Sequence, residues 1–534
     1  MTGRTVTARM LAAAIVVSLV VVAGGTALAW WATTAGGDTA VESATFETDS
    51  GVELRGTVHE PAGASAEEPA PAVLLVHGFT NERETMSALA TEFAARGYVA
   101  VTVDQPGHGA SAPPAFVDGW GGPAALAFTR GLASVDGDRV AMVGHSMGEF
   151  ASLAAARDQP EGYTGVVLLG STWGPLSGLG STAADIGLDQ LPRANATFPR
   201  NMAVSFGTFD EFAPYMYDEP VPGAVDRGEK LAAAFGTDPP VEHGRTYGSI
   251  EARTARRFTA PRTVHTGMTY SPSVVENTVA WVEQTTGGTD DSDTAGATAS
   301  DGDTGGPGAS EQRWYWATLG HVVSFFAAIG LAVATTALAW RRVTGTRTGD
   351  VERVTGPGEF TTDTDGLVSG RQALAVSVVP ALALYPLYGL GAVAVPVTRL
   401  THQELSNAFV VWALGSVLLV AGLLRWQDEM AVWREWADDW RAHAPERTVT
   451  LRGLVAALVG IGLVYAVVSL VALVPGGGVR TWLARLAVLT PVRWFSVAVY
   501  ALPMTAAVLV LSYGLAGSDR ERSLPREVGR AVAT

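Results

Sequence analysis

Six apolar stretches of the chain are long enough to cross a lipid bilayer as helices. A hydrocarbon core of about 30 Å needs about 20 helical residues. The stretches cover residues 10–32, 317–339, 373–397, 405–424, 453–474 and 494–516. Five of the six come late in the chain, so the pattern predicts an all-α transmembrane bundle in the C-terminal part.

Between the first two apolar stretches, short apolar runs alternate with segments of helical periodicity. The runs at 73–76, 98–103 and 140–144 contain no polar alternation, as expected of strands that are covered on both faces of a sheet. Helical spacing follows at 89–95 and again at 271–282. This order predicts an α/β domain with a mostly parallel, doubly wound sheet.

These patterns divide the chain into four expected segments. The stretch at 287–312 is rich in Gly, Thr and Asp and has almost no apolar residues, so we expect a flexible acidic linker there. The segments are an N-terminal signal anchor at 1–36, the α/β domain at 40–286, the linker at 287–312, and a membrane domain with about five transmembrane helices at 313–534.

The first apolar stretch follows Arg4 and Arg9 and ends at Trp30 and Trp31. A cleaved signal peptide usually has a shorter apolar core of about 7 to 15 residues, and Trp side chains favour the headgroup region. We therefore expect an uncleaved signal anchor. Cleavage after the small residues before Trp30 is the alternative, and it would leave the α/β domain tethered by the later helices.

The formal charge of −16 is concentrated in the first part of the chain. Residues 38–312 contain 37 Asp and Glu against 15 Lys and Arg, whereas residues 313–534 contain 15 against 19. A surface this acidic repels nucleic acid, so no DNA or RNA partner is expected. Lys230 is the only lysine, and this use of Arg on an acidic background resembles the halophilic composition of proteins from extreme halophiles.

The arginines beside the apolar stretches predict the orientation in the membrane. With the N-terminus inside, the short inner segments carry 14 arginines, and the outer ones carry only Arg399, Arg480, Arg485 and Arg493. Positive charge favours the cytoplasmic side, which predicts a multi-pass cell-membrane protein with both termini cytoplasmic and the α/β domain extracellular. His321, near the outer third of its helix, is the only ionisable group expected inside a predicted span, so the pattern does not favour a transporter.

Three motifs stand at the ends of successive predicted strands. They are H-G-F at 77–79, D-Q-P-G-H-G-A-S at 104–111 and G-H-S-M-G at 144–148. Ser146 would lie on a sharp turn between a strand and a helix, which only small flanking residues allow. In this order the motifs resemble the α/β-hydrolase superfamily, and its esterases and dienelactone-hydrolase-like serine hydrolases in particular. The resemblance covers about residues 40–286 and implies an α/β-hydrolase fold.

Acyl transfer requires a nucleophile, a base, an acid that orients the base, and two N–H donors for the developing oxyanion. Ser146 is the predicted nucleophile. The backbone N–H groups of Met147, at a helix start, and Phe79, after His-Gly, are the predicted oxyanion donors. Glu149 replaces the small residue that usually follows this motif, a change that would narrow or polarise the pocket.

The base must be a histidine that arrives on a later strand. His265 ends the run F-T-A-P-R-T-V-H and precedes a helical pattern, a strand-loop-helix setting for a catalytic loop, so it is preferred over His243. For the acid, the G-T-F-D loop after the strand at 202–206 resembles the acid position of the superfamily and indicates Asp210, with Glu211 as its rival. The chain order nucleophile, acid, base is the one that this architecture produces.

The sequence therefore predicts a membrane-anchored, carboxylesterase-like serine hydrolase that acts on a small-molecule ester or related acyl substrate. No cofactor and no metal are expected, and the absence of cysteine excludes thiol catalysis. A peptidase or acyl-peptidase with the same triad and a non-catalytic hydrolase-like ectodomain are the alternatives. The lipid bilayer is an expected partner, and the sequence names no protein partner.

Overall fold

The computed structural model describes residues 7–173, 191–287, 312–344, 378–380, 382–383, 387, 410–419, 447–481, 485–489, 494–495, 497 and 500–501. Nearly all of the predicted linker lies outside these residues, as do most of the predicted spans at 373–397, 405–424 and 494–516.

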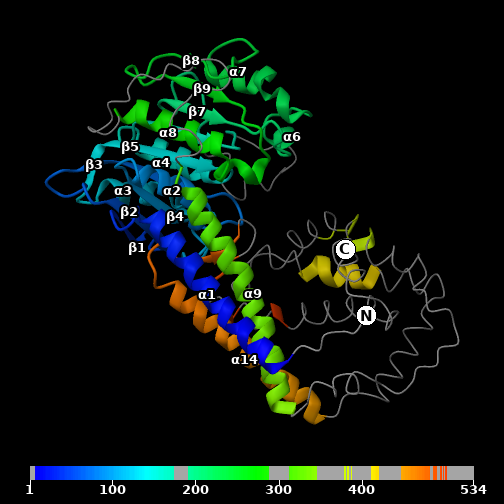
Figure 1. Ribbon diagram of the computed structural model, residues 1–534. Coiled ribbons are helices and arrows are strands. Elements are labelled where there is room, and N and C mark those ends of the chain that lie inside the picture. The colour runs from blue at the N-terminus through cyan, green and yellow to red at the C-terminus, as the bar shows by residue number, and fades with distance from the viewer. Residues whose placement is uncertain are drawn as a thin grey trace. The chain divides into compact units, whose positions relative to one another are not determined.

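A nine-stranded mixed sheet forms the centre of the described α/β region, with the strand order β1-β2-β4-β3-β5-β6-β7-β9-β8 (Figure 1). The strands from β4 to β9 in this order run parallel. β1, β2 and β8 are antiparallel to their neighbours. The bounds are β1 Thr39–Glu47, β2 Glu53–Pro61, β3 Ala70–Val76, β4 Val99–Asp104, β5 Val135–His145, β6 Gly165–Leu169, β7 Met202–Ser205, β8 Thr246–Tyr247 and β9 Arg256–Thr259.

Helices cover both faces of this sheet. One apolar cluster joins the sheet to α3 (Gly122–Arg130), α4 (Gly148–Asp158) and α7 (Glu229–Phe235). A second cluster on the other face contains α2 (Ser87–Ala94) and α8 (Pro272–Thr286). Every residue of β4 is buried, which explains why the central apolar runs contain no polar alternation.

The structure extends one predicted strand considerably. The apolar run at 140–144 predicts only the second half of β5, which begins at Val135. The first half, D-G-D-R, is polar and partly exposed, and it joins β3 through a register shift between Ala70 and Ala72. Because this half is partly exposed, its sequence lacks the apolar signal of a buried strand.

Within the described part of the chain, three helices are long and apolar enough to cross a membrane: α1 (Ala8–Thr33), α9 (Trp314–Thr344) and the part of α14 (Arg447–Val471) from Leu451 onward. α1 and α9 touch through small residues, since a Cβ at Gly25 would overlap Ser324 of α9. The Ser324 hydroxyl donates to the Val22 carbonyl over 3.3 Å. Small residues at such a contact let helix backbones approach closely, as in membrane bundles.

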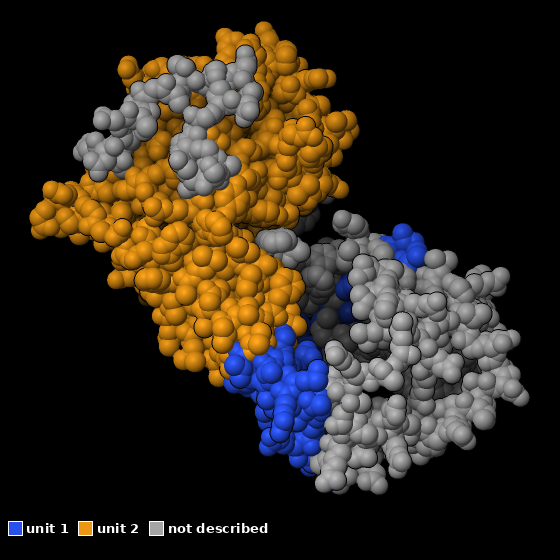
Figure 2. Space-filling model, in the orientation of Figure 1, with its two compact units in different colours: residues 1–16, 330–465, 488–534 blue, residues 17–329, 466–487 orange. Residues whose placement is uncertain are grey.

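The chain forms two compact units (Figure 2). The larger unit consists of residues 17–329 and 466–487, so it combines the α/β region with parts of all three long apolar helices and with the chain that follows α14. The smaller unit consists of residues 1–16, 330–465 and 488–534. The four segment boundaries expected from the sequence stay predictions.

Candidate active site

Ser146 lies on the turn between β5 and α4, with a φ of 51°. A non-glycine residue rarely adopts this left-handed conformation, and such strain gathers at functional sites. Its N–H donates to the Leu169 carbonyl on β6 over 2.9 Å, which holds the turn. Gly148 is required beside it, because a Cβ there would overlap the Val76 carbonyl oxygen.

Three side chains far apart in the sequence meet at the carboxyl ends of the parallel strands. His265, the first residue of the short helix η5 (His265–Thr269), places Nε2 2.9 Å from Ser146 Oγ. Its Nδ1 lies 2.9 Å and 3.1 Å from the two carboxylate oxygens of Asp210, on the loop after β7. This arrangement makes Nδ1 a donor to the carboxylate and leaves Nε2 free to accept the serine proton.

The surroundings of Asp210 and His265 restrict both side chains. Asp210 is fully buried and His265 is 7% exposed. Gly170, with a φ of 53°, follows β6, and a Cβ there would come within 3.1 Å of both Asp210 and His265. The Phe212 ring packs on the imidazole with 4.4 Å between ring centroids. Sequence reasoning missed Gly170, because only the fold brings it beside the other two.

The two rival residues make other contacts. The Glu211 carboxylate accepts from the backbone N–H of His265 over 3.3 Å and so contacts the main chain of the loop. His243 forms an isolated β-bridge with Phe258, and its ring packs against that phenylalanine. The catalytic roles of Ser146, Asp210 and His265 stay predictions, but their side chains have the mutual geometry that the roles require.

The two predicted oxyanion donors flank Ser146. A Cβ at Gly78 would come within 3.1 Å of Ser146 Cβ, so the main chain before Phe79 passes directly against the nucleophile. Met147 immediately precedes α4, whose N-terminus favours negative charge. Within the described residues, neither the Phe79 nor the Met147 N–H has a hydrogen-bond acceptor. Both amides are therefore free to donate to a substrate oxygen.

The loop at 77–83 that carries Phe79 is held at its first residue. The His77 ring donates from Nδ1 to the Gly78 carbonyl over 2.7 Å, and Nε2 accepts from the Gln105 N–H over 3.1 Å. Burial lowers the pKa of His77 to about 4, so the ring is neutral as these two bonds require. His77 is a structural residue that joins this loop to the 104–111 motif.

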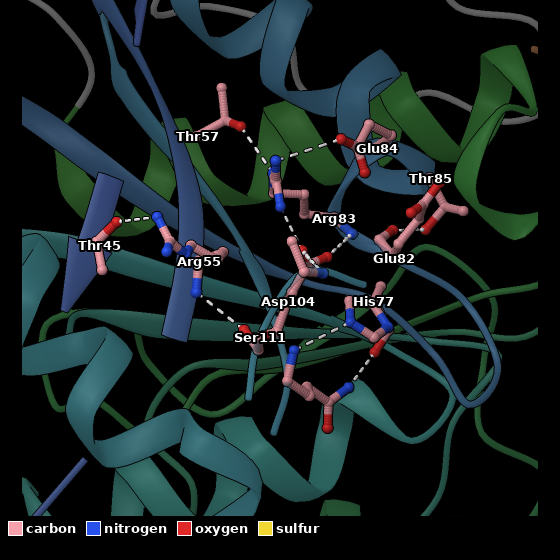
Figure 3. A network of polar contacts seen from close by, with 12 residues as sticks. Thr45, Arg55, Thr57, His77, Glu82, Arg83, Glu84, Thr85, Asp104 and Ser111 are labelled. Carbon is pink, nitrogen blue, oxygen red and sulfur yellow. Dashed lines mark hydrogen bonds and ion pairs between the residues drawn. The ribbon is translucent and has the colours of Figure 1, made fainter. Parts of the chain in front are cut away.

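Asp104 holds the other end of the 77–83 loop (Figure 3). Its carboxylate forms an ion pair with the Arg83 guanidinium and accepts the Arg83 N–H over 2.7 Å. It also accepts the Ala110 N–H over 2.8 Å. A Cβ at Gly109 would overlap the carboxylate. These contacts explain why an Asp and a glycine are required at Asp104 and Gly109 of the 104–111 motif.

The structure places Glu149 inside the protein, where its carboxyl is 1% exposed. One oxygen accepts the Thr172 N–H over 2.6 Å. Burial raises the pKa of Glu149 well above its usual range, although Lys230 opposes the shift. Glu149 thus contacts the chain that follows β6, and its effect on the pocket stays a prediction. No group of three or more possible metal ligands occurs within the described ranges.

His145, next to the nucleophile, makes the stability of the protein depend on pH. Burial, with a contribution from His265, lowers its pKa from 6.5 to about 3. The folded state therefore prefers neutral His145, and the stability that it contributes above pH 6.5 is lost as the pH falls from 6.5 toward 3. In His145→Gln this loss is absent, and the amide can still donate to the His265 carbonyl that accepts from His145.

We expect His145→Gln to gain stability relative to the wild type by about 1.4 kcal/mol per pH unit below pH 6.5. Melting temperatures of both proteins between pH 7.5 and pH 4.5 measure the difference. A constant difference across this range would contradict the depressed pKa.

Comparison with known proteins agrees with this architecture. Residues 67–183 match the family described as serine aminopeptidase, S33, a range that includes the motifs at 77–79 and 144–148 but ends before Asp210. The strand order and this match confirm the predicted fold class: the larger unit contains an α/β-hydrolase domain. The match also supports a hydrolase of the serine type.

Several solved structures are similar to this chain. They include the α/β hydrolase GrgF from Penicillium sp. sh18, at 12% identity over 46% of this chain and 99% of that chain, with a TM-score of 0.33. A predicted CIB-like hydrolase from Thermoplasma acidophilum has 16% identity over 46% and 99%, with a TM-score of 0.30. A thermophilic esterase from Thermogutta terrifontis has 17% identity over 46% and 99%, with a TM-score of 0.31. A comparison with curated proteins gave no match.

Proposed function

We propose that this protein is a membrane-anchored serine hydrolase that cleaves a carboxylic ester or a related acyl substrate. The observation that carries the proposal is the hydrogen-bonded series Ser146 Oγ, His265 Nε2, His265 Nδ1 and Asp210, with 2.9 Å at each of the two junctions. The strained φ of Ser146 and the two free amides beside it add support.

In the proposed reaction, Ser146 Oγ attacks the substrate carbonyl carbon while His265 Nε2 takes the hydroxyl proton. The oxyanion that forms accepts hydrogen bonds from the backbone N–H groups of Phe79 and Met147. The C–O bond to the alcohol then breaks, the alcohol leaves with the proton from His265, and the acyl group remains on Ser146. Water attacks this ester with His265 as its base, which releases the carboxylic acid and restores the serine.

We further propose that the α/β domain lies outside the cell and that both termini are cytoplasmic. The distribution of arginines supports this orientation. It requires the chain after α14 to lie on the same side of the membrane as the α/β domain. In agreement, Arg485 from that chain forms ion pairs with Glu82 and Glu84 of the domain.

Labelling of the full-length protein in native membranes tests the proposal. A fluorophosphonate is expected to form one adduct, on the peptide that contains Ser146, and the same sample is expected to hydrolyse p-nitrophenyl acetate. Aminoacyl p-nitroanilides test the peptidase alternative, which the name of the matching family favours. A protein that reacts with neither substrate class and shows no adduct would be the non-catalytic ectodomain.

A further inference from the structure

A small hairpin from the C-terminal part of the chain lies against the loop that carries Phe79. Its strands are β10 (Val479–Arg480) and β11 (Arg485–Leu486), which follow α14. Both strands belong to the same compact unit as the α/β-hydrolase domain. One arginine of each strand contacts the domain, although nearly 400 residues separate Arg480 from its partner Glu84.

Arg485 contacts the short helix η1 (Arg83–Met86), which directly continues the 77–83 loop. Its Nη1 lies 2.8 Å from a carboxylate oxygen of Glu82 and 2.8 Å from one of Glu84. All three side chains are between 20% and 28% exposed, so solvent weakens these pairs only in part. One guanidinium thus bridges the two acids on either side of Arg83.

Arg480 binds the main chain at the junction of η1 and α2. Its guanidinium donates to the Glu84 carbonyl and to Ser87 Oγ, over 2.9 Å each. His321 of α9 orients it: the imidazole accepts from Arg480 Nε over 3.3 Å and donates to the Gly476 carbonyl over 2.9 Å. These two hydrogen bonds explain the presence of His321 near the outer third of the predicted span at 317–339.

Together these residues form a charge cluster of three acids and three arginines: Glu82, Glu84, Asp104, Arg83, Arg480 and Arg485. Figure 3 shows the part of the cluster that the hydrolase domain itself supplies. Arg83 alone cannot balance three carboxylates, and a partly buried acid without a partner is costly. Burial raises the pKa of Glu84, but the charges of Arg485, Arg83 and Arg480 lower it to about 2, so this acid is ionised.

The charge cluster can affect the position of the Phe79 amide because η1 begins only four residues after Phe79. Asp104 holds Arg83 from the sheet side, and the hairpin holds the acids on either side of Arg83. Thr80, between Phe79 and η1, has a φ of 66°, so this turn is conformationally demanding. Release of the two acids is expected to let η1 move and to shift the Phe79 amide away from the oxyanion.

We infer that the β10–β11 hairpin is a positioning element of the active site, in which Arg480 and Arg485 fix η1 and thereby the Phe79 amide. The inference rests on the proposed oxyanion role of Phe79. It gives the membrane-proximal chain after α14 a function in catalysis beyond anchoring, and it accounts for two of the four arginines on the predicted outer side.

Arg485→Gln in the full-length protein, reconstituted in lipid, tests the inference. Misplacement of a catalytic group by about 1 Å costs about 100-fold, so we expect kcat for p-nitrophenyl acetate to fall about 10- to 100-fold. KM is expected to change little, because the donor acts in the transition state. Rates are expressed per active site titrated with fluorophosphonate, which removes the effect of a smaller folded fraction.

Two variants separate positioning from general damage. Arg485→Lys keeps a charge between the two acids and is expected to retain most of the activity. Arg485→Gln combined with Glu84→Gln restores the balance of charge and is expected to recover much of the lost kcat. Arg245→Gln is the matched control, because Arg245 pairs with Glu242 on the surface, where both side chains are more than half exposed.

Hydrogen exchange gives a readout that does not need activity. In Arg485→Gln, deuterium uptake is expected to rise in residues 77–87 and to stay unchanged in α7. Unchanged kcat together with unchanged uptake would overturn the inference and leave the proposed function intact. If the wild type hydrolyses no ester but the variant shows the local rise in uptake, the hairpin still fixes η1 and the proposed function fails instead.

Discussion

Replacing Ser146 by alanine is expected to lower kcat for p-nitrophenyl acetate by about 10⁴- to 10⁶-fold and to abolish fluorophosphonate labelling. The change removes the atom that forms the acyl bond, and it leaves His265 and Asp210 without a nucleophile to activate. The free amides of Phe79 and Met147 remain, so a small residual rate over water is expected. Stopped-flow or long-time absorbance assays on purified full-length protein measure this range.

Ser152→Ala is the matched control for this variant. Ser152 lies on α4, one and a half turns after the nucleophile, and its hydroxyl donates only to the Gly148 carbonyl, over 3.0 Å. We expect it to label and to turn over like the wild type. Labelling of Ser146→Ala at the wild-type rate would show that the nucleophile is another residue. Loss of activity in both variants would indicate damage to the turn.

Asp210→Asn is expected to lower kcat by about 10⁴-fold. The buried carboxylate accepts from His265 Nδ1 through both oxygens, so it holds the imidazole in the tautomer that can take the Ser146 proton. An amide offers the ring a donor as well as an acceptor and permits the wrong tautomer. The measurement is kcat between pH 6 and pH 9, since a tautomer defect persists across this range.

Glu211→Gln is the natural comparison, because it makes the same chemical change one residue further on. Among the described residues, Glu211 accepts only from the His265 main chain, over 3.3 Å, so a small loss of kcat is expected. A larger loss in Glu211→Gln than in Asp210→Asn would make Glu211 the acid. Equal and small losses would contradict a catalytic acid on this loop.

Much of the fold could be predicted because the sheet is covered on both faces. The residues at 73–76 and 99–103 lie within the buried strands β3 and β4, and Thr102 is the only polar residue among them. The beginning of β5 was not predictable in this way, since its D-G-D-R is polar and partly exposed. The antiparallel pairing of β2 with β4 likewise depends on contacts that no local pattern records.

The residues of the candidate site could be predicted from the sequence for a related reason. Parallel strands bring their carboxyl ends to one edge, so side chains on the turn or loops that follow β5, β7 and β9 are placed close together by topology. That rule leads to Ser146, Asp210 and His265 without any knowledge of distances. This rule does not choose between Asp210 and Glu211. Both residues lie on the same loop and differ only in the direction of their side chains, which the packing of the loop sets.

By itself, the sequence determined the α/β class, the placement of Ser146 on a strained turn, and the long apolar helices, because each depends on local periodicity or on small residues at fixed spacing. Only the tertiary structure decided that Glu149 is buried, that His145 must stay neutral, and that Arg480 and Arg485 neutralise acids beside Phe79. These properties come from partners distant in the chain, and burial and charge balance exist only once those partners meet.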